Sequence, residues 1–509
     1  MSTNPKQQTI GPQTAGSRPS AKKDWLSLSW LYPEAFGTPE LVTSYNAVLV
    51  RGQSEEYKFI VPSENAAVQP KSSAFDRWLE ACEEVADHRL CAPGLYKGVR
   101  ALSWSDGEPL WLHEEPSMEF EPPAGNLLPS ISDIAIVRAR LRSEFLLENL
   151  LRKEEAESED LSARVARSLV GFHRSSQVAA PIDQQRAVHA GEKLKNESRA
   201  NCRNLLAQTA PGSILEFVCQ ELMSHLQRFF SSRYGALGSA AKQGAVIDCH
   251  GALEMGNIAF DPFVSPCARP MFFGRPGRLD NARINYTISD VASLYLDMSA
   301  CGFNRCARVL LQEYFDRAPE TKDSDLLRSL IVWSAIRRSS QIADECSLEP
   351  CDEQERVTSL LATAYRILLE LAGPRIILIA GVDAEQEILT QSVAELTNAD
   401  IVHIAGKPSE HSSQLDSAQL TARSLFRQER PLVLSASTLS RPLLEFSIGM
   451  GRLHSLAATN ILLNKQIADR SSEENEHWRS FAASSVVELE ASLPLPEMCR
   501  EILYTIRHQ

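Results

Sequence analysis

The sequence lacks any long apolar run. Its longest aliphatic stretch, Ile376 to Ala380, has the length of a strand, whereas a bilayer-spanning helix needs about 20 apolar residues. Residues 1–23 also lack the apolar centre of a secretory signal and are rich in Ser, Thr, Gln, Pro and Gly. We therefore expect no membrane insertion, a disordered tail over residues 1–23, and a cytoplasmic protein.

Paired cysteines and hydrolase motifs are missing as well. None of the 11 cysteines belongs to a CxxC pair, and the closest spacings, Cys301 with Cys306 and Cys346 with Cys351, have no matching His or Cys partners. Structural zinc sites need such partners, so reduced thiols are expected instead. GxSxG and HExxH are absent, and so the sequence gives no support for a serine hydrolase or a zinc hydrolase.

Positive charge is scarce outside the tail. The chain has a formal net charge of −13, and the tail holds four basic residues and no acidic one, which leaves about −17 for the rest. A nucleic-acid-binding surface requires clustered positive charge, so we expect no nucleic-acid partner.

The periodicity of apolar residues divides the 509 residues into several parts. Two β-rich runs within 41–62 predict a hairpin, residues 74–91 have helical spacing, and strand patterns return around 96–111. These elements predict a small α+β lobe over residues 24–130. Helical spacing predicts a helical lobe over residues 131–372.

From residue 373 onward, strand and helix patterns alternate. Strands are expected at 375–381, 400–404 and 431–435, with helices at 384–396 and 417–428. Alternation of this kind is typical of a parallel α/β sheet. We therefore expect an α/β domain over residues 373–509.

The stretch HGALEMGN, residues 250–257, has the spacing of a kinase catalytic loop. His250, Gly251 and Asn257 stand in the expected places, but Ala252 occupies the position of the loop's carboxylate. Other stretches agree in order with such a kinase: YK at 57–58, GFH at 171–173, RP at 269–270 and DVAS at 290–293.

This ordered set resembles the aminoglycoside-phosphotransferase-like kinases, and more narrowly a bacterial group in which that module is fused to a C-terminal P-loop module. The resemblance covers roughly residues 30–509. It implies an α+β protein-kinase-like bilobal fold followed by an α/β P-loop NTPase-like domain. It also implies ATP-dependent phosphotransfer, in which the loop carboxylate positions the acceptor hydroxyl and the later Asn binds magnesium.

The sequence departs from this pattern at the catalytic base. Ala252 cannot deprotonate or orient a hydroxyl, and loss of a positioned base typically lowers the rate about 10² to 10⁴-fold. The nearest carboxylates are Asp248, expected to be structural, and Glu254, a possible substitute. Asn257 is then a remnant that braces the loop backbone, or a magnesium ligand if nucleotide binds.

Two further kinase groups are expected to be missing. The resemblance places the second metal-binding carboxylate at Gly274, with Asp280 as the possible replacement. It places the sheet lysine at Ile60, so Lys58 is interpreted as a solvated strand residue and Glu84 as a helix carboxylate that has lost its partner.

The expected P-loop is also degenerate. In IILIAGVDAEQEIL, Gly381 is in place, but Gln386, Glu387 and Ile388 replace the Gly, Lys and hydroxyl residue of GxxxxGK[ST]. One charge pair at ~4 Å and an effective dielectric of ~20 is worth about 4 kcal/mol, so Glu387 would repel phosphate. Ser435 stands where a metal-associated Asp is expected.

These departures predict a catalytically degenerate kinase-like protein, or pseudokinase, that acts as a binding, scaffold or regulatory component with a protein partner and no cofactor. The alternative is a divergent small-molecule phosphotransferase that uses ATP and magnesium through Asn257 and Asp280, with Glu254 or Asp248 as the base. A third hypothesis keeps a nucleotide as a noncatalytic ligand.

Overall fold

The computed structural model describes most of residues 40–60 and 74–111, then 116–117, 131–153, most of 158–265, 269–276, 283–346, 352–368, most of 376–404, and short segments from there to residue 502. The chain forms two compact units. The first comprises residues 1–154 and 256–283, and the second comprises 155–255 and 284–509. The expected tail over residues 1–23 lies outside the described residues.

The first unit is built on an antiparallel sheet of six strands. The spatial order is β1-β2-β3-β6-β4-β5, and the strands are β1 (Glu40–Thr43), β2 (Ala47–Arg51), β3 (Glu55–Ile60), β4 (Tyr96–Ser105), β5 (Glu108–Trp111) and β6 (Ile131–Ala139). Strands β2 and β3 form the hairpin predicted within 41–62. In the sheet, Lys58 of β3 lies opposite Ile136 of β6 and Leu49 of β2.

Helix α2 (Ala74–Cys91) covers this sheet and matches the predicted bounds. Asp76 lies in its first turn and His88 and Arg89 in its last, which complements the helix dipole. Trp78, fully buried, and Val85 pack with residues of β4 and β6 in the core of the unit. Burying each such large side chain stabilises the fold by about 1.5–3 kcal/mol.

The expected start of the helical lobe at residue 131 is wrong. Residues 131–139 form β6, which pairs with both β3 and β4 inside the first sheet. The segment ISDIAIVRA is rich in β-branched residues, and burial of Ile134 to Val137 by neighbouring strands favours a strand. The described helices of the second unit begin at Ser158.

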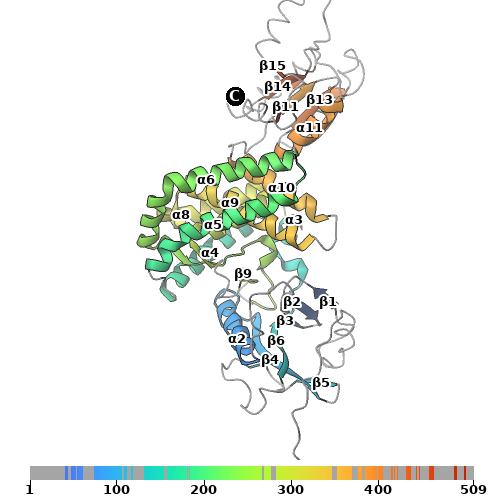
Figure 1. Cartoon of the computed structure of the whole chain (residues 1–509). Coiled ribbons are helices and arrows are strands. Elements are labelled where there is room, and N and C mark those ends of the chain that lie inside the picture. The colour runs from blue at the N-terminus through green and yellow to red at the C-terminus, as the bar shows by residue number, and fades with distance from the viewer. Residues whose placement is uncertain are drawn as a thin grey trace, which may run out of the picture. The chain divides into compact units, whose positions relative to one another are not determined.

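The second unit contains a helical part, visible in Figure 1 as a layered bundle. Helix α7 is almost entirely buried and packs on α9, while α5 packs on α6 and α4 on α8. The helices are α4 (Ser158–Ala179), α5 (Gln184–Gln208), α6 (Ile214–Ala240), α7 (Ile288–Ala300), α8 (Asn304–Arg317), α9 (Ser324–Cys346) and α10 (Asp352–Leu368). Strands β7 (Val246–Asp248) and β10 (Ile284–Tyr286) pair beside them.

Residues from 376 onward form a parallel sheet, as the alternating pattern predicts. Its order is β12-β13-β11-β14-β15, with β11 (Ile376–Ala380), β12 (Asp400–Ile404), β13 (Leu432–Ala436), β14 (Ala458–Leu463) and β15 (Val486–Leu489). Helix α11 (Ala384–Thr397) contacts β11, β12 and β13. The helix expected at 417–428 lies largely outside the described residues, and the domain boundary near 372 stays a prediction.

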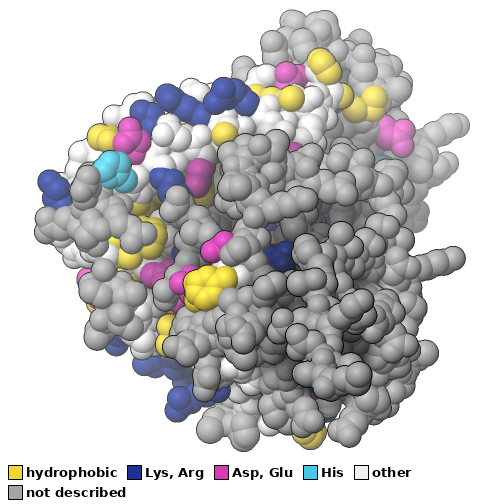
Figure 2. Space-filling model, turned by 60° about the horizontal axis from the view of Figure 1, so that its bottom comes forward, with side chains coloured by type: hydrophobic (Ala, Val, Ile, Leu, Met, Phe, Trp, Pro, Cys, Tyr) yellow, Lys and Arg dark blue, Asp and Glu magenta, His cyan; other side chains and the backbone are white. Residues whose placement is uncertain are grey.

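The described surface carries charges of both signs. On the face shown in Figure 2, Lys and Arg side chains are interspersed with Asp and Glu side chains. Among the helices that the structure describes, no helix combines the length and apolar character needed to cross a membrane.

Candidate functional site

The loop after β7 is fixed at both ends by carboxylates of α7. Asp290, fully buried, accepts hydrogen bonds from the backbone N–H of His250 at 2.6 Å and of Gly251 at 2.9 Å. Asp297 accepts from the N–H of Met255 at 2.8 Å. Because these carboxylates are seven residues apart, they lie on one face of the helix, two turns from each other. Gly251 has a φ of 85°, a conformation that favours glycine.

His173 supports Asp290 from α4. Its Nε2 lies 3.1 Å from Asp290 and its Nδ1 lies 2.8 Å from the Tyr314 hydroxyl. Both ring nitrogens of His173 therefore have hydrogen-bond partners. Burial by itself raises the pKa of Asp290, but the hydrogen bond from His173 and the nearby His173 and His250 rings hold that pKa below its ordinary value. Asp290 is therefore a carboxylate that stabilises the loop backbone.

Two consecutive arginines of α9 complete the support of the loop. Arg337 donates to the Gly251 carbonyl at 2.9 Å, and Arg338 pairs with Asp297 at 2.9 Å and with Glu254 at 2.8 Å. Burial raises the pKa of Glu254 above its ordinary value, although the positive charge of Arg338 acts in the opposite direction. Glu254, the possible substitute base, is thus held in an ion pair with α9.

The remaining loop residues differ in their exposure and pairing. Asp248 ends β7 opposite Ile284 of β10, a position that suits the expected structural role. Ala252 is partly exposed, whereas Leu253 beside it is fully buried. Buried side chains of α7 and α9 thus hold the loop backbone, and Ala252 presents a methyl group where the resemblance places a carboxylate.

The first unit contains the next two predicted positions, at the ends of a small hairpin. Asn257 precedes β8 (Ile258–Ala259) and Gly274 follows β9 (Met271–Phe272), and the N–H of Phe273 donates to the Asn257 carbonyl at 3.0 Å. A Cβ added to Gly274 would lie 2.8 Å from Asn257 Oδ1. The two expected metal-binding positions are therefore adjacent, but the second has no side chain.

Metal-binding alternatives are few in the part of the chain that the structure describes. Asp280 lies outside the described residues. Within them, no group of three or more His, Cys, Asp or Glu side chains is placed to hold a metal ion. Asn257 offers one amide oxygen, and Gly274 offers none of the carboxylate oxygens that magnesium prefers.

Gly274→Ala is expected to destabilise the first unit by about 1–2 kcal/mol, because its φ of 74° strains an L-residue and its new methyl group displaces the Asn257 amide. Urea unfolding measures the effect. Gly302→Ala is the matched control, since Gly302 has a φ of 88° and no atom within 4 Å of an added Cβ. Equal losses in the two variants would show that the contact with Asn257 contributes nothing.

The expectation that Glu84 has no lysine partner is wrong. Lys58 Nζ of β3 lies 2.6 Å from Glu84 Oε1 of α2, and both side chains are largely buried. Residues two apart in a strand share a face, so Lys58 and Ile60 are on the same side of β3. Lys58 contacts the helix carboxylate, so its interpretation as a solvated strand residue is wrong as well.

This ion pair is linked to the hairpin through α2 and β4. The Nδ1 of His88 is 2.6 Å from the Glu84 carbonyl, and the His88 ring packs 4.6 Å from the ring of Tyr96. Burial lowers the pKa of His88 and raises that of Tyr96, whose hydroxyl also bonds the backbone of Gly274. Both rings are therefore neutral links between the Lys58–Glu84 pair and the Asn257–Gly274 hairpin.

In the C-terminal sheet the predicted P-loop positions are only partly described. Gly381 lies outside the described residues, and Glu387 is exposed on α11. Gln386 Nε2 donates to Ser435 Oγ of β13 at 2.8 Å. The start of α11 and the end of β13 are thus adjacent, with uncharged polar groups in contact and a carboxylate at the expected lysine position.

No protein-family model matches the chain, and no curated protein matches it in sequence. Three kinase structures are similar to it. A glucosamine kinase complex with glucosamine, ADP and phosphate has 14% identity, a TM-score of 0.40, and covers 70% of this chain and 86% of its own. A choline/ethanolamine kinase family protein from Mesorhizobium loti has 12% identity and a TM-score of 0.37, and the match covers 68% of this chain and 95% of that protein. An ADP-bound aminoglycoside phosphotransferase has 12% identity and a TM-score of 0.31, and the match covers 67% of this chain and 96% of that protein.

Sequence reasoning missed the residues that support the loop from α7 and α9. Asp297 of α7 and the pair Arg337 and Arg338 of α9 are charged residues that are buried. Such residues are rarely buried without partners. The spacing of Asp290 and Asp297 on one helix face was a usable signal, but their partner at residues 250–255 is not local in sequence.

Proposed function

We propose that this chain is a catalytically degenerate kinase-like protein that binds a nucleotide without transferring its phosphate and acts through a protein partner. One observation carries the proposal. The Lys58–Glu84 pair is formed, while the base position is Ala252 and the second metal-binding position is Gly274. In protein kinases the strand lysine paired with a helix glutamate contacts the nucleotide phosphates. The chain therefore keeps a phosphate-binding cation and lacks the groups for chemistry.

The remaining geometry supports a kinase-like arrangement. An antiparallel sheet carries one covering helix, a loop with the His-Gly spacing follows β7, and a buried Asp of α7 holds the loop amides. The parallel sheet from residue 376 onward supports a degenerate P-loop-like domain, because β11 lies at its centre and the residues after it carry Glu387 in place of the lysine.

A nucleotide held in this way fits the residues present better than a magnesium complex does. Lys58 supplies a partly buried positive charge, whereas Gly274 supplies no oxygen for a cation. Charge-assisted contacts with phosphate do not require a metal ion. The structure thus favours the hypothesis of a noncatalytic nucleotide over the expectation that no cofactor is bound.

Calorimetric titration with ATP and ADP, with magnesium or with EDTA, tests the proposal. We expect binding in both conditions, no turnover, and at least about tenfold weaker binding in Lys58→Met, because one charge-assisted contact is lost. Lys97→Met is the matched control, since Lys97 forms an ion pair with Glu55 in the same sheet. It is expected to bind like the native chain.

Two outcomes would contradict the proposal in different ways. Magnesium-dependent turnover that disappears in Asn257→Ala would favour the alternative, a divergent small-molecule phosphotransferase. An absence of binding at millimolar nucleotide would remove the nucleotide and leave a purely protein-binding role.

A further inference from the structure

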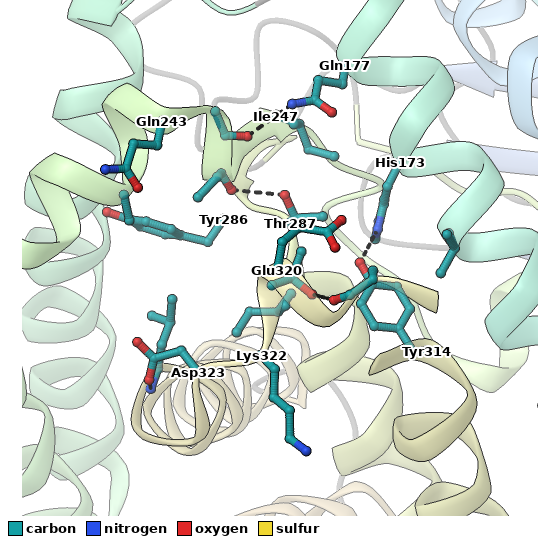
Figure 3. A pocket seen from close by; sticks show the side chains of 18 of the residues that line it. His173, Gln177, Gln243, Ile247, Tyr286, Thr287, Tyr314, Glu320, Lys322 and Asp323 are labelled. Carbon is teal, nitrogen blue, oxygen red and sulfur yellow. Dashed lines mark hydrogen bonds between the residues drawn. The ribbon is translucent and has the colours of Figure 1, made fainter. Parts of the chain in front are cut away.

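A cavity of about 440 Å³ opens in the helical part of the second unit. It lies between α4, the turn that follows α6, the start of α7, and the segment joining α8 to α9. Figure 3 shows His173, Tyr314 and Thr287 around its interior. Val170, Ile247 and Leu326 give it an apolar wall. This volume suits a small organic molecule.

The hydroxyl groups of the cavity have their protons committed to the protein. Thr287 donates to the Ala245 carbonyl at 2.9 Å, and Thr321 donates to the Ala318 carbonyl at 2.8 Å. His173 directs its Nε2–H to the Asp290 carboxylate, so its Nδ1 accepts the Tyr314 hydroxyl proton. Each hydroxyl therefore presents only lone pairs to a ligand.

Two of the lining side chains that carry amide or guanidinium donors bond to the backbone. Gln177 Nε2 donates to the Gly244 carbonyl at 3.4 Å, as drawn in Figure 3, and Arg174 donates to the Arg317 carbonyl at 2.7 Å. The side-chain oxygen of Gln177 adds another acceptor. The lining is consequently rich in acceptors.

The two acidic side chains of the cavity lining, Asp323 and Glu320, differ in whether they are already paired within the protein. Asp323 is already bonded to the N–H of Leu326 at 3.0 Å and lies 3.5 Å from Arg233. Glu320 lies near Tyr314, and among the described residues none forms an ion pair with its carboxylate. The amine of Lys322 points away from Glu320 and Thr287 in Figure 3. Glu320 is therefore the negative charge that a ligand would meet.

We propose that this cavity binds a small organic cation, an amine or guanidine on an apolar body. The cationic head donates to Glu320 and to the hydroxyl oxygens of Tyr314 and Thr287, while the rings of Tyr286 and Tyr314 and the aliphatic wall contact the body. Neutral ligands with acceptors only, and anions, would meet the Glu320 carboxylate and the Tyr314 and Thr287 hydroxyl groups, whose protons are already donated to the protein. The inference does not depend on nucleotide binding.

A ligand here contacts the same Tyr314 that bonds His173. From His173 the hydrogen bonds continue to Asp290 and then to the amides of His250 and Gly251. Occupation of the cavity is therefore expected to slow hydrogen exchange in the 246–255 segment. Unchanged exchange with the cavity occupied would overturn this coupling.

The test uses the full chain and three probes that share a ring and differ in charge: phenethylamine, phenethyl alcohol and phenylacetate. Titration followed by ligand-observed NMR is expected to give about tenfold tighter binding of the amine than of the alcohol, since a charge-assisted hydrogen bond is gained, and no binding of the anion. Glu320→Gln is expected to weaken amine binding about fivefold, the upper range for an exposed ion pair.

Two control variants make the test decisive. Asp316→Asn removes an exposed carboxylate of α8 outside the cavity lining and is expected to leave amine binding unchanged. Ala240→Leu places a larger side chain at the end of α6, where it fills part of the cavity, and is expected to weaken amine binding. Equal affinity for the three probes, or native amine affinity in Glu320→Gln or in folded Ala240→Leu, would overturn the proposal.

Discussion

Asp290→Asn is expected to lower the free energy of unfolding by about 3 kcal/mol, the range for breaking a buried, hydrogen-bonded charge. The native carboxylate accepts three hydrogen bonds, from His173 and from the amides of His250 and Gly251. An amide presents only one acceptor oxygen, so its NH₂ group is turned toward another donor. Urea unfolding followed by circular dichroism measures the loss.

The same variant is expected to change the pH dependence of stability. The pKa of Asp290 is raised by burial but lowered further by its His173 contact, and it lies below the ordinary value. A depressed pKa adds stability above about pH 4, the unfolded value, and this stability is lost as the pH falls through the folded value. The difference in the free energy of unfolding between the native chain and Asp290→Asn should therefore become smaller below about pH 4.

Asp316→Asn is the control for both measurements, because Asp316 is exposed. Its effect should stay within about 0.5 kcal/mol. If Asp290→Asn behaved like this control, Asp290 would not hold the loop in solution.

Arg338→Met is expected to cost about 3–5 kcal/mol, because it leaves two carboxylates without their buried partner. Arg338 is 3% exposed and lies within 2.9 Å of both Asp297 and Glu254. Loss of the positive charge also removes an interaction that opposes the raised pKa of Glu254. Denaturant unfolding of the purified chain measures the change.

Arg356→Met provides a matched comparison at the same glutamate. Arg356 is 56% exposed and lies 3.6 Å from Glu254, so its loss should cost no more than about 1 kcal/mol. Adding Asp297→Asn to Arg338→Met should recover part of the stability, since one unpaired charge is removed. Equal effects of the two arginine variants would show that Arg338 is not the main support of the loop.

Local patterns predicted much of the fold. The helix at 74–91, the hairpin within 41–62 and the strands at 376–380 and 400–404 follow from apolar periodicity. The HGALEMGN spacing singled out Asn257 and the resemblance singled out Gly274, and the structure places these two residues side by side. These features depend on residues close together in sequence, where side-chain period and turn chemistry decide the outcome.

Interactions between distant segments were not predicted. Lys58 and Glu84 are 26 residues apart, and the pattern gave the lysine position to Ile60 on the same strand face. Residues 131–139 were assigned to the helical lobe because the pairing strands, β3 and β4, lie well before them in sequence. The supports from Asp297, Arg337 and Arg338 were missed for the same reason.

By itself, then, the sequence determined that positions 252 and 274 carry no carboxylate, because Ala and Gly lack those atoms in any fold. Local periodicity also determined the helix at 74–91 and the strands at 376–380 and 400–404, but not the strand at 131–139. Only the tertiary structure decided which charges are paired. Whether Lys58 meets Glu84, or Glu254 meets Arg338, depends on how a strand, a loop and distant helices dock, because an ion pair forms only when packing brings its two side chains within about 4 Å.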